Sequence, residues 1–124
     1  IKAIRNNHVV CLLCDRDIQG TGVSVTFFDE ETSIPAGPAT LSIRTGAKII
    51  PVAVYQRSKL HHAIVRPPLS SARQGNLRED VARISQDIAR SFEELILLEP
   101  EQWHLMSPNW PSDHEAVKKH YGKS

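Results

Sequence analysis

The sequence lacks an excess of charge of either sign. Its 124 residues include 15 Lys and Arg against 14 Asp and Glu, which leaves a formal net charge of +1. A nucleic-acid-binding domain normally carries a clustered surplus of Lys and Arg, so this composition argues against nucleic acid as a partner. No apolar stretch approaches the roughly twenty residues of a membrane-spanning helix, so we expect no such helix within these residues.

Cysteines are scarce, and the two present do not suggest a zinc or redox site. Cys11 and Cys14 form one Cys-x-x-Cys, and no second pair completes a zinc site. Side chains alternate between the faces of a strand, so an offset of three directs these thiols to opposite sides. We therefore expect two buried, reduced core cysteines, no metal and a cytoplasmic location.

One stretch near the N-terminus joins an apolar run to a charged triplet. The run Val9–Cys14 has no polar face, which is typical of a strand covered on both sides in a parallel sheet of an α/β domain. In open sheets of that kind, ligands bind beyond the carboxyl ends of the strands. The triplet Asp15, Arg16 and Asp17 would lie there. The alternative is that the triplet begins a polar turn and makes only surface salt links.

Further strand and helix signals follow along the chain. Strands are expected over 23–28, 48–55 and 61–65, and a short helix of small residues over 39–45, with Gly46 closing it in a left-handed conformation. The acidic residues 29–31 indicate a solvated loop, and the adjacent His61 and His62 indicate surface positions. These patterns predict an α/β fold with a partial, largely parallel sheet and flanking helices.

The clearest helical signal begins at Asn76. Asn76 is expected to cap a helix of about twenty residues, with Glu79 reaching back to it and Pro100 beyond its end. Its apolar stripe recurs at steps of three and four and consists of Leu77, Val81, Ile84, Ile88, Phe92 and Leu95. Two acid–base pairs are expected on its water-exposed side: Asp80 with Arg83, and Asp87 with Arg90.

An aromatic segment, Trp103–Trp110, follows the long helix and has no regular period. It either packs across the body of the domain or supports binding to a partner or a membrane interface. His104 within it is interpreted as a packing or capping residue. Residues 114–124 are charged and are expected to be a flexible tail.

As a series, these motifs resemble one family. In order they are Val9–Asp17, Gly22-Val23, Phe27-Phe28, Pro35-x-Gly37-Pro38, Thr45-Gly46-Ala47, Pro51, Trp103-His104-Leu105, Pro108 and Trp110. Together they look like the C-terminal half of the bacterial phosphatidylinositol mannoside acyltransferases. Those enzymes are relatives of the lipid A acyltransferases in the lysophospholipid acyltransferase-like superfamily. The resemblance runs from about Asn6 to Asp113, so we expect residues 1–124 to be the C-terminal portion of one acyltransferase domain of a longer protein.

The resemblance implies transfer of a fatty acyl group from acyl-CoA, which is a substrate rather than a cofactor, to a sugar hydroxyl of a glycolipid. It also implies a peripheral enzyme at the cytoplasmic face of the cell membrane. One alternative is a lipid A or lysolipid acyltransferase of the same superfamily. Another is a non-catalytic α/β module that binds a ligand such as a nucleotide. Against the last, the charged triplet stands where a Gly-rich phosphate loop would follow the first strand.

The resemblance also assigns roles to the triplet. The family's base is the histidine of a His-x4-Asp motif, which is absent from this chain, so we expect it upstream and expect the chain alone to be inactive. The family sets the Glu of a Glu-Arg-Asp triplet against that histidine, and Asp15 holds the matching position as the expected catalytic carboxylate. Arg16 and Asp17 are expected to bind substrate, although Arg16 is equally well explained by an ion pair with Asp17.

Two departures from the family pattern accompany these assignments. Asp15 is one methylene shorter than the family's Glu, and Asp29 stands where the family tends to have Gly after its Phe pair. Because part of a sheet leaves an open edge, we also expect the isolated chain to self-associate.

Overall fold

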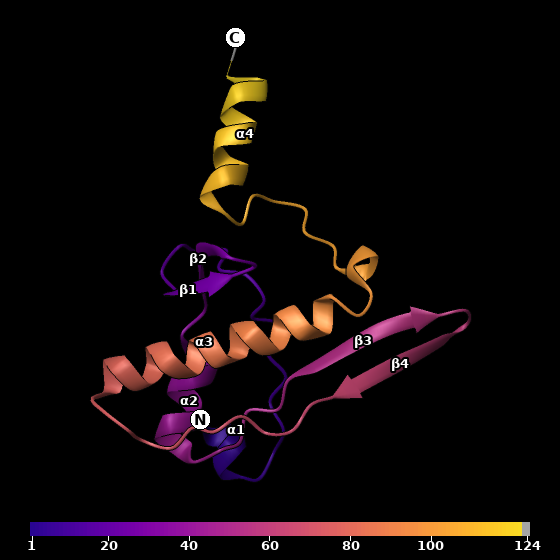
Figure 1. Cartoon of the computed structure of the whole chain (residues 1–124). Coiled ribbons are helices and arrows are strands. Elements are labelled where there is room, and N and C mark those ends of the chain that lie inside the picture. The colour runs from indigo at the N-terminus through magenta and orange to yellow at the C-terminus, as the bar shows by residue number, and fades with distance from the viewer. Residues whose placement is uncertain (123–124) are drawn as a thin grey trace.

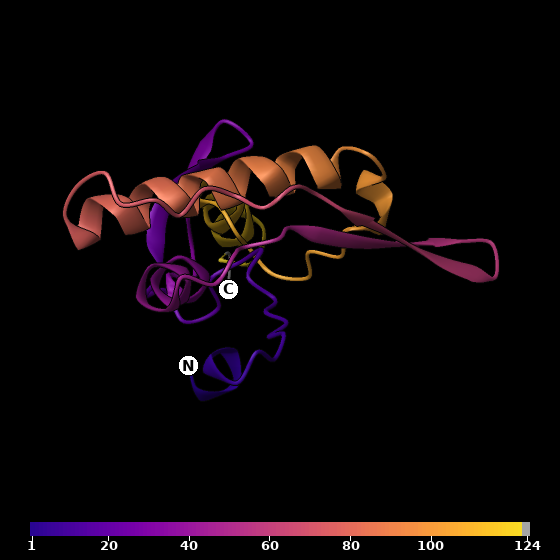
Figure 2. The same ribbon diagram turned by 90° about the horizontal axis from the view of Figure 1, so that it is seen from below.

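The computed structural model describes residues 1–122. Its elements are, in chain order, α1 (Lys2–Arg5), β1 (Val23–Phe27), β2 (Glu30–Ile34), α2 (Gly37–Thr45), β3 (Val52–Arg57), β4 (Leu60–Val65), α3 (Leu77–Ile96), the 3-10 turn η1 (Pro100–Gln102) and α4 (Pro111–Tyr121). The long helix α3 crosses the middle of the molecule, between α2 and the β1–β2 hairpin (Figure 1). The β3–β4 hairpin projects from the body in both views (Figures 1 and 2).

The strands form two antiparallel hairpins. β1 pairs with β2 from Val23↔Ile34 to Phe27↔Glu30, and β3 pairs with β4 from Val52↔Val65 to Arg57↔Leu60. The expected mixture of helices and strands is therefore confirmed, but the expected largely parallel sheet is wrong for residues 1–122. Only two residues join the strands of each hairpin, and a parallel pair needs a crossover of a dozen residues or so.

The apolar run Val9–Cys14 is not a strand in this structure. Its residues have no regular secondary structure, and Val9 and Leu13 are 89% and 100% exposed. The expectation of a strand covered on both sides is therefore wrong here, because a strand needs partners for its backbone groups and no described strand pairs with this run. Cys14 is buried but Cys11 is exposed, so the expectation of two core cysteines holds only for Cys14.

Helix α3 carries the core, as its sequence pattern predicts. Its capping box is present, with Glu79 N–H donating to Asn76 Oδ1 and Asn76 N–H donating to Glu79 Oε2, each at 3.0 Å. Its stripe packs against β1 and α2 in a cluster that contains Val25, Phe27, Ile34, Ala39, Ile84, Ile88 and Ala89. Each fully buried aliphatic side chain contributes about 2 kcal/mol of hydrophobic stabilisation. The short helix α2 also ends as expected, at Gly46 with a φ of 73°.

Two glutamines close the backbone edges of the hairpins. On β1, Gln86 of α3 accepts from Thr26 N–H at 2.8 Å and donates to Thr26 C=O at 2.8 Å. On β3, Gln102 accepts from Gln56 N–H at 2.7 Å and donates to Gln56 C=O at 3.2 Å. Each side-chain amide thus takes the place of one residue of a neighbouring strand. This reduces the exposed backbone edge, which is a site of unwanted association when it is unpaired.

The acidic loop expected over residues 29–31 is mostly strand. Glu30 and Glu31 begin β2, and the turn before them places Phe28 and Asp29 at φ values of 52° and 61°. Two left-handed residues in a two-residue hairpin are what a type I′ turn requires. Gly suits this conformation best, which gives a physical reason for a Gly at the position that Asp29 occupies.

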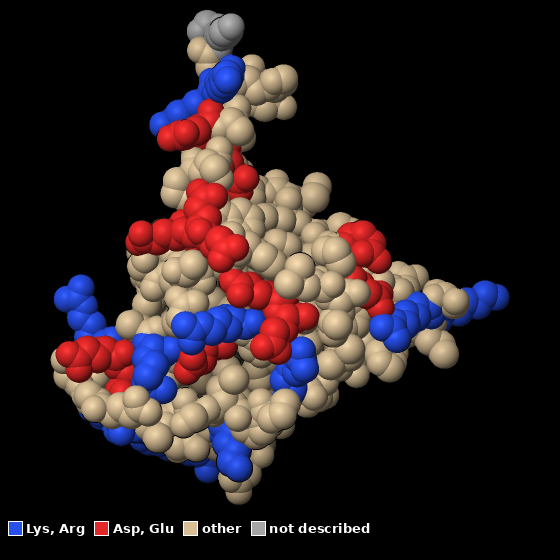
Figure 3. Space-filling model, viewed as in Figure 1, with Lys and Arg blue, Asp and Glu red and all other residues tan. Residues whose placement is uncertain are grey.

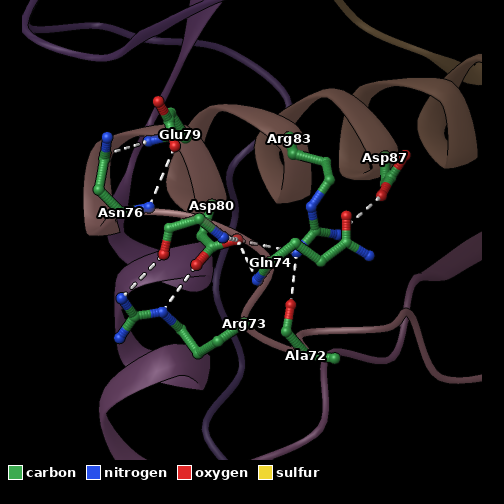
Figure 4. A network of polar contacts seen from close by, with 9 residues as sticks. Ala72, Arg73, Gln74, Asn76, Glu79, Asp80, Arg83 and Asp87 are labelled. Atoms are coloured by element: carbon green, nitrogen blue, oxygen red, sulfur yellow. Dashed lines mark hydrogen bonds and ion pairs between the residues drawn. The ribbon is translucent and has the colours of Figure 1, made fainter.

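Asp80 is buried, contrary to its expected place on the wet side of α3. It is 1% exposed and accepts hydrogen bonds from Arg73 Nε at 2.7 Å and from the backbone N–H of Gln74 at 2.9 Å and Gly75 at 3.3 Å (Figure 4). Arg83 adds a longer contact of 3.4 Å. The loop before α3 thus folds back over its own helix and is fixed there by one carboxylate.

Candidate functional site

Asp15 is held by a residue 88 positions away in the sequence. Trp103 Nε1–H donates to Asp15 Oδ2 at 2.9 Å, and the side chains of both residues are half-buried. Within residues 1–122, Oδ1 of Asp15 accepts no hydrogen bond. A carboxylate has roughly four acceptor positions on its two oxygens, so most of the hydrogen-bonding capacity of Asp15 is free for another donor.

Trp103 is fixed within a cluster of four aromatic rings. Its ring centroid lies 5.8 Å from Phe27 at 71°, 6.1 Å from Phe28 at 37° and 6.1 Å from Trp110 at 80°. Edge-to-face and tilted arrangements at such distances are favourable for aromatic pairs. The two end residues of the segment, Trp103 and Trp110, therefore pack against the body of the domain, as the first of its two interpretations predicts, while Met106 between them is 86% exposed.

Asp17 organises the loop that follows Asp15. Its carboxylate accepts from the backbone N–H of Gln19, Gly20 and Gly22 at 3.2, 3.0 and 2.6 Å and from Ser33 Oγ at 3.0 Å. Burial acts to raise the pKa of Asp17, but the bonds from Gly22, Ser33 and the other two donors outweigh it and hold the pKa below its usual value. Asp17 thus ties its loop to β2, and its substrate contact stays a prediction.

Arg16 and Asp17 do not form the ion pair that the sequence left open. Arg16 is half-buried and lies within 4.0 Å of no carboxylate in the described part of the chain. Arg16 is therefore not used by any ion pair that would compete with a phosphate. A surface hollow of about 400 Å³ lies on the Asp17 side of this loop, against Glu31 and His114. Asp15 is not among its lining residues.

Cys14 lies directly before the triplet and is a poor nucleophile. Burial, helped by the negative charge of Asp15, raises the pKa of the Cys14 thiol to about 11. A thiol reacts as its thiolate, and at neutral pH almost none of Cys14 is in that form. The sulfur of Cys14 is therefore unsuited to nucleophilic catalysis, and the carboxylate of Asp15 remains the candidate group at this site.

The histidines of the chain do not supply a partner for Asp15. All six are exposed, and those described make no hydrogen bond to its carboxylate. The surface positions expected for His61 and His62 are confirmed, whereas His104 is exposed rather than packed. Residues 1–122 hold no group of three or more His, Cys, Asp or Glu arranged to bind a metal ion.

Comparison with known proteins identifies the family. A model described as bacterial lipid A biosynthesis acyltransferase matches residues 1–112. The chain belongs to this family. Phosphatidylinositol mannoside acyltransferases of Mycobacterium tuberculosis and Mycolicibacterium smegmatis are 39% and 36% identical to it over 110 residues, or 89% of the chain. These matches cover 33% and 34% of the two relatives, so the chain spans about a third of their length.

Sequence reasoning selected Asp15 but missed its contact with Trp103. The family resemblance contains both the triplet and the Trp-His-Leu motif, yet nothing in their spacing places the two side chains together. One weak signal was present, since a Trp in a loop with no apolar period must find both a packing site for its ring and an acceptor for its N–H. Asp15 of the charged triplet supplies that acceptor for Trp103, whereas Trp110 uses a backbone carbonyl.

Proposed function

We propose that this chain is part of an O-acyltransferase that moves a fatty acyl group from acyl-CoA to a sugar hydroxyl of a phosphatidylinositol mannoside-type glycolipid. Its family and the activity named for its mycobacterial relatives support the reaction class and the acceptor. The observation that carries the proposal is Asp15, a half-buried carboxylate held through one oxygen, with no hydrogen bond to the other from residues 1–122. A lipid A or other lysolipid acceptor is the second candidate, because the matching family model is described by lipid A biosynthesis.

In the proposed reaction a histidine removes the proton of the acceptor hydroxyl, whose oxygen attacks the thioester carbonyl of acyl-CoA. The carbon–sulfur bond then breaks, and the imidazolium returns the proton to the CoA thiolate. Asp15 would accept a hydrogen bond from the imidazole, fix its tautomer and stabilise the imidazolium. Arg16 would bind a phosphate of acyl-CoA or of the acceptor, for which a guanidinium fork is well suited.

The histidine base is the part of this mechanism that residues 1–124 do not supply. No His-x4-Asp occurs among them, and no described histidine bonds to Asp15. We propose that the base comes from elsewhere in the full-length protein, and that the 124-residue chain alone does not transfer acyl groups. Acyl-CoA turnover by the isolated chain with a mannosylated inositol lipid would contradict this division of the site.

The proposed place of action is the inner surface of the cell membrane. No helix within residues 1–122 is long and apolar enough to cross a membrane. The projecting β3–β4 hairpin supports a peripheral contact, because Val54 and Val65 on one of its faces are 60% and 63% exposed, and Lys and Arg stand at its tip (Figure 3). Apolar side chains next to cations favour anionic lipid surfaces. Sedimentation with anionic vesicles tests this membrane contact. Protein that stayed entirely in the supernatant would count against it.

Self-association of the isolated chain is proposed from the open run Val9–Cys14. Three of its apolar side chains are exposed by between 46% and 100%, namely Val9, Leu12 and Leu13. Apolar surface of this kind, next to an unpaired backbone, is prone to pair with a second copy. Sedimentation velocity at micromolar concentration is expected to show a dimer or a larger species, and a clean monomer would refute this proposal.

Asp15→Asn in the full-length protein tests the proposed reaction. We expect turnover to fall by about ten-fold to a few thousand-fold, because the imidazolium loses its charged partner, while the melting temperature stays within about 2 °C. Asp15→Glu restores the longer side chain of the family and should keep turnover near that of the wild type. An Asp15→Asn protein that melts and turns over like the wild type would exclude Asp15 from the site.

A further inference from the structure

Two tryptophans in the aromatic cluster use their indole N–H groups differently. Trp110 Nε1–H donates to the backbone carbonyl of Phe27 at 2.8 Å, which closes the tail onto β1. Trp103 Nε1–H donates to the side-chain carboxylate of Asp15 at 2.9 Å. The first contact joins two parts of the fold, whereas the second ends on the one carboxylate that the proposed reaction needs. We infer that Trp103 is a positioning residue that sets the orientation of the Asp15 carboxylate for acyl transfer, an inference that rests on the proposed role of Asp15.

The position of Trp103 is fixed before it reaches Asp15. Its backbone N–H donates to Pro100 C=O at 3.1 Å at the end of η1, and the preceding Gln102 is bonded to both backbone groups of Gln56. Its ring is in the aromatic cluster described above, with Phe27 fully buried beside it. A donor anchored through both its backbone and its ring loses little conformational freedom when it binds an acceptor.

Asp15 has no comparable anchor of its own. It follows an unpaired run of the chain, and its backbone lies in no helix or strand. The Trp103 N–H binds one carboxylate oxygen, which limits rotation of the carboxylate and leaves Oδ1 available. An orienting carboxylate must present a lone pair to the imidazole in a narrow range of angles. Trp103 is thus able to select one orientation of a side chain that its own backbone leaves free.

The positioning role explains how a shortened carboxylate serves this site. Asp15 has one methylene less than the Glu of the family's triplet, so its carboxylate is closer to its backbone and has fewer orientations to sample. A fixed donor on one oxygen then determines where the second oxygen lies. The purely structural alternative is that Asp15 only satisfies an indole N–H that would otherwise be buried without a partner. The two roles differ in what happens when the N–H is removed.

The test compares Trp103→Phe with Trp110→Phe in the full-length protein. Both changes keep an aromatic ring in the cluster and delete one indole N–H, so both should lower the melting temperature by similar amounts. We expect Trp103→Phe to lower kcat about ten-fold with KM for acyl-CoA and acceptor within about two-fold, since a hydrogen bond to a charged group carries this much free energy. Trp110→Phe should leave kcat per folded molecule within about two-fold. Equal kcat values for the two variants would overturn the proposal.

Two further variants make the test independent of folding and of the proposed function. Replacement of Trp103 by 3-benzothienylalanine keeps the bicyclic ring and removes only the N–H, and it should reproduce the loss in kcat. In an Asp15→Asn background, Trp103→Phe should lower kcat by less than about two-fold more, because the two residues act as one unit. If Asp15→Asn lowered turnover and Trp103→Phe did not, only the positioning role of Trp103 would be overturned. If Asp15→Asn turned over like the wild type, the role of Asp15 and the positioning role would both be overturned.

Discussion

The two regions around Asp80 and Asp15 use a carboxylate in opposite ways. Asp80 is buried, and its two oxygens accept bonds from Arg73, Gln74, Gly75 and Arg83 (Figure 4). Asp15 is half-buried and accepts a single bond from Trp103 within residues 1–122. A saturated carboxylate stabilises the loop around it, whereas an unsaturated one retains capacity for a group that the described residues do not supply.

The segments around the two carboxylates also differ, because the one around Asp80 is well packed and hydrogen-bonded and the one before Asp15 is not. Around Asp80, helix α3 is capped, the centre of its apolar stripe is buried at Ile84 and Ile88, and the preceding loop is bonded back onto it. Before Asp15, the run Val9–Cys14 exposes most of its apolar side chains and pairs with no described strand. The stability of this chain therefore resides mainly around α3, while the candidate chemistry lies at the end of its least supported segment. Low local stability at functional segments is common in proteins.

The largest effect on stability is expected from Asp80→Asn. The substitution removes the charge that Arg73 pairs with and leaves an amide N–H₂ facing the donors of Gln74 and Gly75, so we expect Tm to fall by about 10 °C. Thermal unfolding followed by circular dichroism measures it. The matched control is Asp87→Asn on the same helix, whose ion pairs with Arg83 and Arg90 are partly exposed and should be worth little. An equal fall in both variants would show that burial of Asp80 is not what matters.

Acid should weaken the Asp80 region by protonating its buried carboxylate. The Gln74 N–H bond lowers the pKa of Asp80 most, burial opposes it, and Arg73, Arg83 and Gly75 lower it further, so that the folded pKa lies below its usual value. A carboxyl whose folded pKa is depressed stabilises the fold above its unfolded pKa, about 4, and this contribution is lost as pH falls through the folded pKa. Tm measured from pH 5 to pH 2 should decline, and Asp80→Asn should show a shallower decline. Parallel curves would contradict this assignment.

The smallest effect on stability is expected in the exposed apolar run Val9–Cys14. Leu13 is fully exposed, so Leu13→Ser in the 124-residue chain should change the free energy of unfolding by less than about 0.5 kcal/mol. Ile88→Ala, which empties a buried position on α3, should cost about 3 kcal/mol. Urea unfolding measures both. A large loss from Leu13→Ser would mean that the run Val9–Cys14 is packed in solution, and the contrast between the two regions would fail.

The parts of the fold that depend on local signals were predictable from the sequence. The period of α3, the Asn76–Glu79 box and the left-handed Gly46 are each determined by residues within a few positions of one another, and each is present. β2 was missed because Glu30 and Glu31 are polar and its turn uses Phe28 and Asp29 in place of glycine. Its strand state depends on pairing with β1 rather than on its own composition.

Long-range contacts account for the remaining errors. The burial of Asp80 comes from a loop that folds over α3, and a spacing of three to Arg83 gives no sign of it. An apolar run such as Val9–Cys14 predicts burial but not what buries it, and no strand among residues 1–122 does so. At the candidate site, the triplet could be selected from its place after the apolar run. Its link to Trp103 could not, because 88 residues of chain separate the two.

The most direct test is whether Asp15 is a functional carboxylate and Asp80 a structural one. Tm and acyl-transfer turnover per folded molecule are measured side by side for Asp15→Asn and Asp80→Asn in the full-length protein. The account predicts a crossed result: Asp15→Asn loses at least about ten-fold in turnover and melts like the wild type, while Asp80→Asn melts about 10 °C lower and keeps its turnover within about three-fold. If Asp15→Asn lost turnover only in proportion to lost folded protein, Asp15 would be a second structural carboxylate, and the central claim would be wrong.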